Sequence, residues 1–156
     1  MITIRNTQRT IHVSEPKLKK IAQGMLKALG YPDFDLGILL TTNKTIRRYN
    51  KTFRNKDKPT DILSFPYHAE LKAGEKIVVR DAEDRNLGDL IISLEYVQKD
   101  AAVRHNRYFD EHMTVLLAHG LAHLLNYDHI NDDDFAVMQK VERKLLKAAN
   151  FKESDR

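Results

Sequence analysis

Three histidines lie close together near the middle of the C-terminal half, at His119, His123 and His129. The chain has seven histidines in all, so this grouping is unusual. If the first two lie on one helix, their side chains are ~40° apart around its axis and ~6 Å apart along it. Two imidazoles can then reach one ion from the same face, and the third can join them if the helix ends in between. The spacing predicts a metal site.

The residues around these histidines indicate what kind of metal site it is. Three neutral imidazoles around zinc leave one coordination position open, as in a catalytic site. Their spacing matches that of the metzincin zinc proteases, and Asn126 can adopt the left-handed conformation that such a turn needs. Gly120, however, stands where metalloproteases carry their general-base glutamate. We therefore predict one catalytic zinc ion per chain and no peptide hydrolysis.

Positive charge is concentrated between residues 44 and 58. Seven lysines and arginines lie there against a single acid, Asp57, whereas the net charge of the whole chain is +4. The basic residues are Lys44, Arg47, Arg48, Lys51, Arg54, Lys56 and Lys58. Such a segment suits a polyanionic partner, although a solvated helix face has the same composition and is the interpretation that charge alone favours.

Length and composition place the chain among ordinary globular proteins. Its 156 residues, 42% hydrophobic and 31% charged, predict a single domain over residues 1–156. Cysteine is absent, so a metal must be held by His, Asp or Glu. Neither a signal peptide nor a run of ~20 apolar residues is present, and we expect a cytoplasmic protein without a membrane partner.

The apolar pattern predicts the elements that position the histidines. Strands are expected over residues 1–5, 35–41, 61–66 and 87–93, and helices over 14–30, 43–53, 94–105, 111–125 and 132–149. Asp110 is expected to cap the helix that carries the first two histidines. The expected fold is α+β or α/β, with a small mixed sheet of about four strands covered by helices and a metzincin-like metal-binding helix.

Three blocks of the sequence are similar to one known family. The segment His119-Gly-Leu-Ala-His-Leu-Leu-Asn-Tyr-Asp-His129 closely resembles the signature of the YbeY proteins, a bacterial family of metal-dependent endoribonucleases and ribosomal RNA maturation factors. Residues 49–66 and 87–93 resemble two further blocks of the family in the same order. Ala122 and Asn126 depart from the leucine and glycine of the signature, and neither change removes a ligand.

This resemblance implies a function and a set of site residues. It implies that His119, His123 and His129 bind zinc and that Arg54 and His119 are catalytic. The substrate would be single-stranded RNA, in small-subunit ribosomal RNA 3′-end maturation and ribosome quality control. The implied partners are ribosomal RNA and the ribosome or its small subunit, and no DNA partner is expected.

The chemistry of the other candidate residues agrees with such a substrate. A guanidinium at Arg54 can stabilise the phosphoryl oxygens of a transition state, while Lys51, Lys56 and Lys58 are expected to hold flanking phosphates. The acids Asp61 and Asp128 can orient ligand imidazoles or serve in turns and caps. Tyr49 and Phe53 can stack on bases, although an aromatic pair facing the core is the favoured interpretation. We interpret His12, His68, His105 and His112 as structural or surface residues.

Two other functions fit parts of this pattern. One is a metzincin-like metallohydrolase of peptides or small molecules, which Gly120 disfavours. The other is a non-catalytic ribosome-assembly protein that binds RNA and holds a structural metal. Imidazole also suits nickel, copper and iron, and either water or the 2′-hydroxyl of the substrate can be the nucleophile.

Overall fold

The computed structural model describes residues 1–153 and contains a single four-stranded sheet. In chain order the elements are β1 (Ile2–Asn6), α1 (Glu15–Leu29), β2 (Asp35–Thr41), α2 (Asn43–Arg54), β3 (Ile62–Pro66), the 3-10 turn η1 (Ala82–Asp84), β4 (Asn86–Ser93), α3 (Leu94–Val103), α4 (Phe109–Leu124) and α5 (Asp132–Ala148). The strand order is β1-β2-β4-β3, with β1, β2 and β4 parallel and β3 antiparallel to β4. The predicted small mixed sheet with helices is confirmed.

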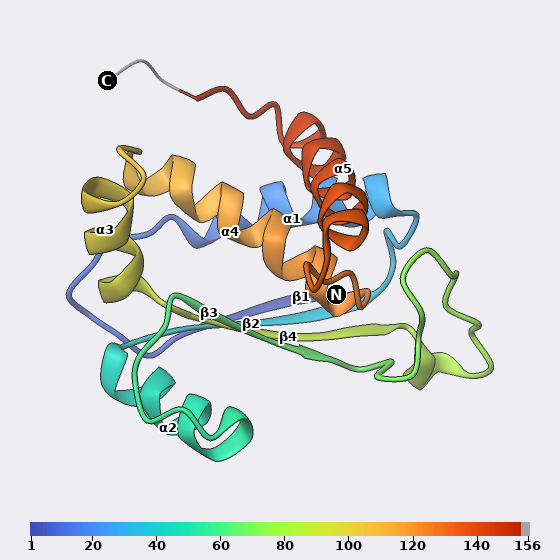
Figure 1. The fold of residues 1–156 in the computed structure, drawn as a ribbon, viewed down its shortest axis with the longest axis horizontal. Coiled ribbons are helices and arrows are strands. Elements are labelled where there is room, and N and C mark those ends of the chain that lie inside the picture. Colours follow the sequence, from blue (N-terminus) through green and yellow to red (C-terminus); the bar gives the residue numbers. More distant parts are fainter. Residues whose placement is uncertain (154–156) are drawn as a thin grey trace.

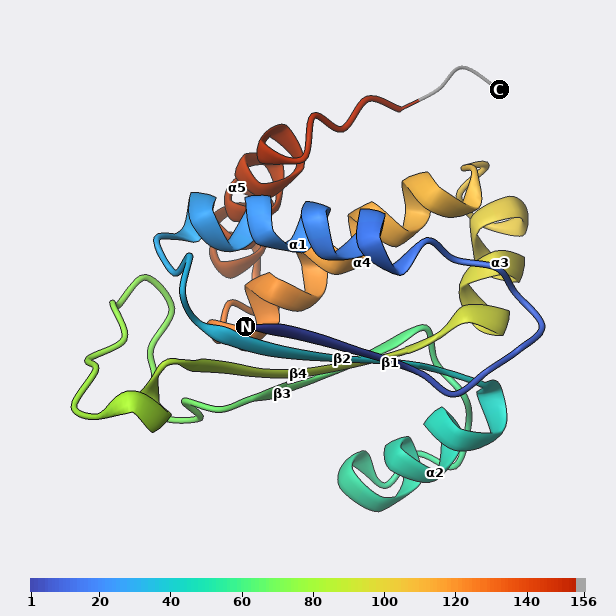
Figure 2. The same ribbon diagram turned by 180° about the vertical axis from the view of Figure 1, so that it is seen from behind.

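The helices are divided unequally between the two faces of the sheet. Figures 1 and 2 show α1, α3, α4 and α5 above the sheet and α2 alone below it. Because side chains alternate along a strand, consecutive residues of β2 point to opposite faces. Leu40 belongs to the main core on the side of α1 and α4, whereas Leu39 packs with Ile46 and Tyr49 of α2. The lower face, with its single helix, is only partly covered.

Hydrogen bonds at the helix ends explain most of the boundaries. The Ser14 hydroxyl accepts from the Lys17 N–H at the start of α1, and Gly30, at φ 86°, ends that helix. The cap expected at Asp110 is wrong. The Glu111 carboxylate accepts the Tyr108 N–H at 3.2 Å, so α4 begins earlier, after Tyr108.

The segment between α3 and α4 also differs from expectation. α3 ends at Val103, two residues before the predicted end at His105, and Asn106 adopts a left-handed φ of 46°. This early end releases His105 from the helix and lets it turn toward α4.

None of the helices in the described part of the chain has the length and apolar character of a membrane span.

Candidate functional site

The end of α4 brings the three clustered histidines together. His119 and His123 lie one turn apart on α4, which ends after Leu124. Asn126 has a left-handed φ of 63°, as predicted, and its side chain donates to the carbonyls of His68 and Leu71 at 2.9 and 2.8 Å. The chain thus turns back, and the ring centre of His129 lies 6.0 Å from that of His119 and 5.7 Å from that of His123.

Two ring nitrogens of this histidine triad lie as close together as two ligands of one metal ion would. The Nε2 atoms of His119 and His123 are 3.0 Å apart. Two nitrogens that each lie ~2.0–2.1 Å from one tetrahedral zinc are ~3.3 Å apart, so the pair fits an ion with little movement. His123 is partly buried, and burial, followed by the positive charge of His119, lowers its pKa. A lowered pKa favours the neutral imidazole that a metal requires.

A carboxylate on a different helix fixes the orientation of His119. The Glu142 Oε1 atom, on α5, lies 2.9 Å from His119 Nδ1. A proton held on Nδ1 by this carboxylate leaves the Nε2 lone pair directed at the shared position, which is the usual pairing of a carboxylate with a metal-binding histidine. Glu142 could not be predicted from the sequence, because nothing in the local pattern of α5 distinguishes it from the acids of a solvated helix face.

The two acids predicted to orient ligand imidazoles lie in the same cleft. Asp128 accepts the His129 N–H at 2.8 Å, and its Oδ1 atom is 3.6 Å from His129 Nδ1. Asp61 accepts from the Ile62 N–H at 2.7 Å and from the Thr60 hydroxyl at 3.3 Å, so its carboxylate supports the start of β3. An orienting role for either acid stays a prediction.

The cleft extends from the histidine triad to Arg54. Its lining includes all three histidines, β3 and the end of α2. Figure 1 shows α2 and α4 on opposite faces of the sheet, yet Arg54, the last residue of α2, lines the same cleft as the histidines of α4. The left-handed Asn55, at φ 57°, and a 2.8 Å bond from Asn50 Nδ2 to the Lys58 carbonyl fold the next segment back onto α2.

The predicted lysines lie outside this cleft. Lys51, Lys56 and Lys58 are exposed but do not line it. Lys51 also shares Asp57 with Arg47, whose Nε atom is 2.8 Å from the carboxylate, compared with 4.0 Å for Lys51 Nζ. The hydrogen bond from Arg47 is the main cause that lowers the pKa of the Asp57 carboxyl, which favours its charged form. These lysines can therefore meet only the parts of a polyanion that extend beyond the cleft.

Gly120 faces the sheet rather than the cleft. A Cβ at this position would lie 2.8 Å from Ile62 Cδ1 and 2.9 Å from Leu90 Cδ2, closer than carbon atoms normally approach. The residue after the first histidine thus permits α4 to pack on β3 and β4. A larger residue at this position would have to displace these side-chain methyl groups.

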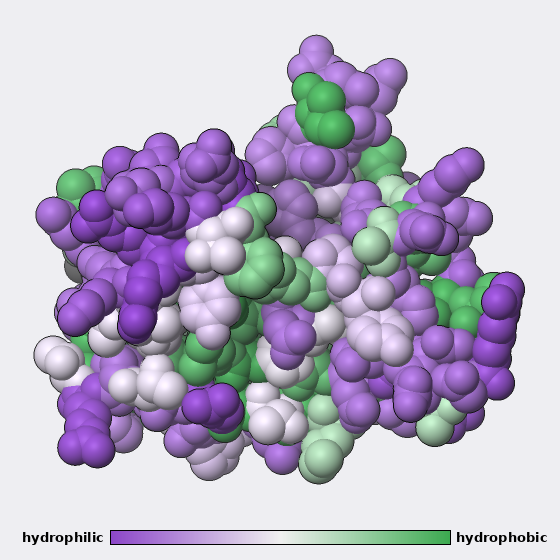
Figure 3. Space-filling model, turned by 90° about the horizontal axis from the view of Figure 1, so that it is seen from below, coloured by the Kyte–Doolittle hydropathy of each residue, from purple (hydrophilic) through white to green (hydrophobic). Residues whose placement is uncertain are grey.

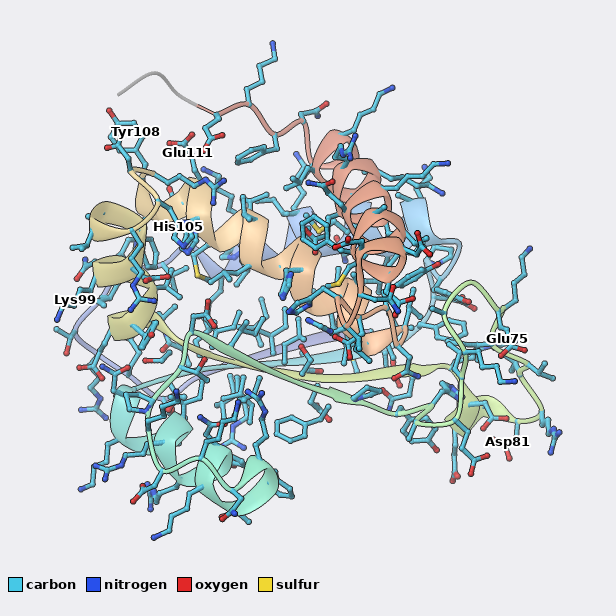
Figure 4. All side chains as sticks on the ribbon, in the orientation of Figure 1. Glu75, Asp81, Lys99, His105, Tyr108 and Glu111 are labelled. Atoms are coloured by element: carbon cyan, nitrogen blue, oxygen red, sulfur yellow. The ribbon has the colours of Figure 1, made fainter. Side chains whose placement is uncertain are left out.

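A second cluster of ligand-type residues lies at the other end of the cleft. The ligand atoms of Asp100, His105 and His112 all lie within 4.8 Å of one another, and the two rings stack with centres 4.5 Å apart. Figure 4 shows His105 where the end of α3 meets the start of α4. The sequence did not predict that His105 and His112 meet each other and Asp100; their interpretation as structural or surface residues stays a prediction. The seven-residue spacing of His105 and His112 does not predict this contact, because the non-helical linker between α3 and α4 separates them.

Arginines surround this second cluster. Arg104 Nε lies 3.3 Å from Asp100 Oδ1, and Arg107 Nη1 lies 3.5 Å from His112 Nδ1. The pKa of His112 is lowered, mainly by burial and to a smaller extent by the charges of His105 and Arg107. The two guanidinium groups repel a divalent cation. Because Arg107 donates to Nδ1 of His112, the proton of the neutral His112 ring lies on Nε2, the atom that a metal would need. These surroundings disfavour a divalent cation at the second cluster, although its ligand atoms lie close together.

Comparison with known proteins agrees across most of the chain. The sequence profile of a family described as Endoribonuclease YbeY matches residues 3–150. A human protein named Endoribonuclease YbeY is 36% identical over 145 residues, covering 93% of this chain and 86% of its own length. A protein of the same name from Vesicomyosocius okutanii is 35% identical, and the match covers 94% of this chain and 94% of that protein. A solution structure from Thermotoga maritima, 21% identical, has the same fold, with a TM-score of 0.56 over 94% of this chain and 90% of its own.

Proposed function

The chain belongs to the endoribonuclease YbeY family, and from this premise and the geometry of its cleft we propose that it is a zinc-dependent endoribonuclease specific for single-stranded RNA. One observation supports the metal mechanism above all others. The Nε2 atoms of His119 and His123 converge to 3.0 Å while Glu142 holds the opposite nitrogen of His119. Such an arrangement is typical of a ligand pair.

The three histidines would hold the zinc ion, with His129 reaching it from the turn after α4. Zinc held by three imidazoles would supply Lewis acidity and would lower the pKa of water to ~7. Glu142 keeps the His119 proton on Nδ1 and limits rotation of the ring. The chain itself thus provides ligand orientation, and no glutamate at position 120 is required.

Arg54 would stabilise the reacting phosphate. Cleavage of a phosphodiester accumulates negative charge on the non-bridging oxygens, and a guanidinium offers two parallel donors to them. Its place on the wall of the same cleft as the histidines supports this role. Arg107, which also lines the cleft, would add positive charge along the path of the strand.

The RNA outside the cleft would follow the basic segment. Lys51, Lys56 and Lys58 are exposed around the end of α2 and would contact flanking phosphates, with an affinity that falls as salt rises. We place the substrate in ribosomal RNA, at the 3′ end of the small-subunit RNA, and the protein with the ribosome or its small subunit in the cytoplasm. The family's part in ribosomal RNA processing supports this placement.

Metal analysis combined with an RNA cleavage assay tests the proposal. Purified protein should contain about one zinc per chain, and His119→Ala should lose both zinc and cleavage of a single-stranded oligonucleotide. His12→Ala is the matched control, because His12 is exposed and does not line the cleft. A His119→Ala protein that still cleaves at the wild-type rate would refute the metal mechanism. Cleavage of a generic protein substrate by the wild type would instead support a metallohydrolase.

A further inference from the structure

We propose that the ring of Phe53 stacks on a base of the bound RNA strand, directly beside the phosphate held by Arg54. This inference rests on the proposed function, since it names how that strand leaves the cleft. Phe53 is 62% exposed at the end of α2, although the sequence favoured a core position for it. A large aromatic ring left this accessible beside an arginine indicates a surface for a ligand with its own aromatic face and negative charge.

Two neighbouring rings hold Phe53 in place. Tyr49 lies almost parallel to it, with ring centres 6.2 Å apart and planes 14° apart. Phe65 of β3 meets it edge-on at 5.2 Å and 72°. Both neighbours are themselves partly buried, so the Phe53 ring is supported from α2 and from the sheet. A ring held in this way loses little side-chain freedom when a base stacks on it.

Phe53 also lies at a junction between two hollows of the surface. It lines the histidine cleft, and with Phe65 it also lines a second hollow on the lower face of the sheet, between α2 and the strands. Figure 3 shows hydrophobic side chains gathered in the middle of this face, beside the hydrophilic surface of α2. A strand that passes from the cleft beside Arg54 into the lower hollow would meet the Phe53 ring, which lines both.

Charge distinguishes RNA from other occupants of this apolar surface. Phe53 lies within the segment that has seven basic residues and one acid, and Arg54 follows it directly. Asp57 pairs with Arg47 and Lys51 only, and an apolar peptide would add no negative charge for the rest of the segment. A single RNA strand satisfies both features at once, because its bases stack on rings while its phosphates meet lysine and arginine.

Binding of single-stranded RNA by Phe53 variants tests the inference. With zinc removed by a chelator to prevent cleavage, Phe53→Ala should bind a single-stranded oligonucleotide about tenfold more weakly than wild type, as expected for one lost stack. Phe53→Trp should retain the affinity, whereas Phe53→Leu, which keeps apolar bulk, should lose most of it. Phe135→Ala is the matched control, because Phe135 is also exposed, at 52%, but lies on α5 and lines neither hollow.

Oligonucleotides that each lack one base locate the stack. Removal of one particular base near the cleavage site should weaken binding to wild type about as much as Phe53→Ala does, and should not weaken binding to Phe53→Ala further. Equal affinity of Phe53→Ala and wild type would overturn the inference and leave the hollow to a protein partner. The inference would also be overturned if the loss of affinity in Phe53→Ala added to the loss caused by removing a base, whichever base is removed.

Failure of this inference can be told apart from failure of the proposed function. If wild type cleaves RNA and Phe53→Ala binds it equally well, only the stacking role is wrong. If wild type binds RNA with the expected dependence on Phe53 but does not cleave it, the stacking role holds and the nuclease mechanism is wrong. Thermal unfolding of each variant confirms that an intact fold is being measured.

Discussion

Two clusters of histidines lie on the same side of α4, and they have opposite electrostatic surroundings. His112 and His119 are seven residues apart, which places them ~10 Å apart along the helix. His119 is backed by the carboxylate of Glu142, whereas His112 has Arg107 at the corresponding nitrogen. The His119 side chain is 33% exposed to the cleft, whereas that of His112 is 3% exposed.

We infer from this difference that close ligand atoms favour a metal only where the surrounding groups do not already compensate them. The second cluster is tight and even includes an acid, Asp100, but its groups already stabilise one another and nearby guanidinium groups. Buried His112 Nε2 has no hydrogen-bond partner among the described residues, which is a local cost of this packing. The partner at the far ring nitrogen decides whether the near one is free to bind a cation.

Removal of one ligand from each cluster tests the comparison most directly. His123→Ala should abolish stoichiometric zinc and reduce RNA cleavage by more than ~100-fold, since loss of a mere supporting partner already costs ~10–100-fold. His105→Ala should leave one zinc per chain. Zinc content by elemental analysis and single-turnover cleavage measure the two effects. Two zinc ions in wild type, with one lost in His105→Ala, would contradict the comparison.

The arginines beside the two clusters should differ in function. Arg54→Ala should lower the cleavage rate by ~10²–10³-fold, the loss expected for a donor to transition-state charge, and weaken RNA binding much less. Arg107→Ala should reduce the rate far less, since Arg107 is paired at 2.6 Å with Glu153. Single-turnover rates and separately measured binding constants distinguish the roles. An equal loss of rate and affinity in Arg54→Ala would reduce it to a binding residue.

The carboxylate behind His119 provides a smaller test. Glu142→Gln keeps the shape of the side chain but removes its charge, and should weaken zinc affinity by ~10–100-fold. Competition with a chromogenic chelator measures this change. Glu83→Gln, an exposed acid of η1 far from the cleft, is the control. Unchanged zinc affinity in Glu142→Gln would show that the 2.9 Å contact is incidental to metal binding.

The smallest expected effect is a pH dependence of stability from His112. Its folded pKa is lowered, chiefly by burial and then by His105 and Arg107, against the opposing charges of Asp100 and Asp61. The unfolded chain therefore binds a proton more readily, so this stability is present above pH ~6.5 and is lost as the pH falls through the lower folded pKa.

Urea unfolding at several pH values checks this dependence. His112→Gln should lose less stability than wild type when the pH falls from 7.5 to 5.5, although it is less stable at the higher pH. Zinc must be removed from both proteins, because its binding to the histidine triad depends on pH and would add that dependence to the measured free energy of unfolding. Parallel curves for the two proteins would contradict the lowered pKa.

Local patterns were sufficient to predict most of the fold. Apolar alternation and caps such as Ser14 and Gly30 act over a few residues, so the order and type of the helices and strands could be predicted from them. The main errors fall between α3 and α4. There the Glu111 side chain reaches back to Tyr108, and a helix that starts earlier competes with the expected cap at Asp110.

By itself, the sequence determined the histidine triad, its turn at Asn126 and the basic segment, because each depends on neighbours along the chain. Only the tertiary structure decided which distant groups meet them. Packing of α5 on α4 supplies Glu142, the β3 edge brings Arg54 into the cleft, and the partly covered sheet leaves Phe53 exposed. These relations depend on how helices and strands pack across the sheet, and no local spacing encodes that packing.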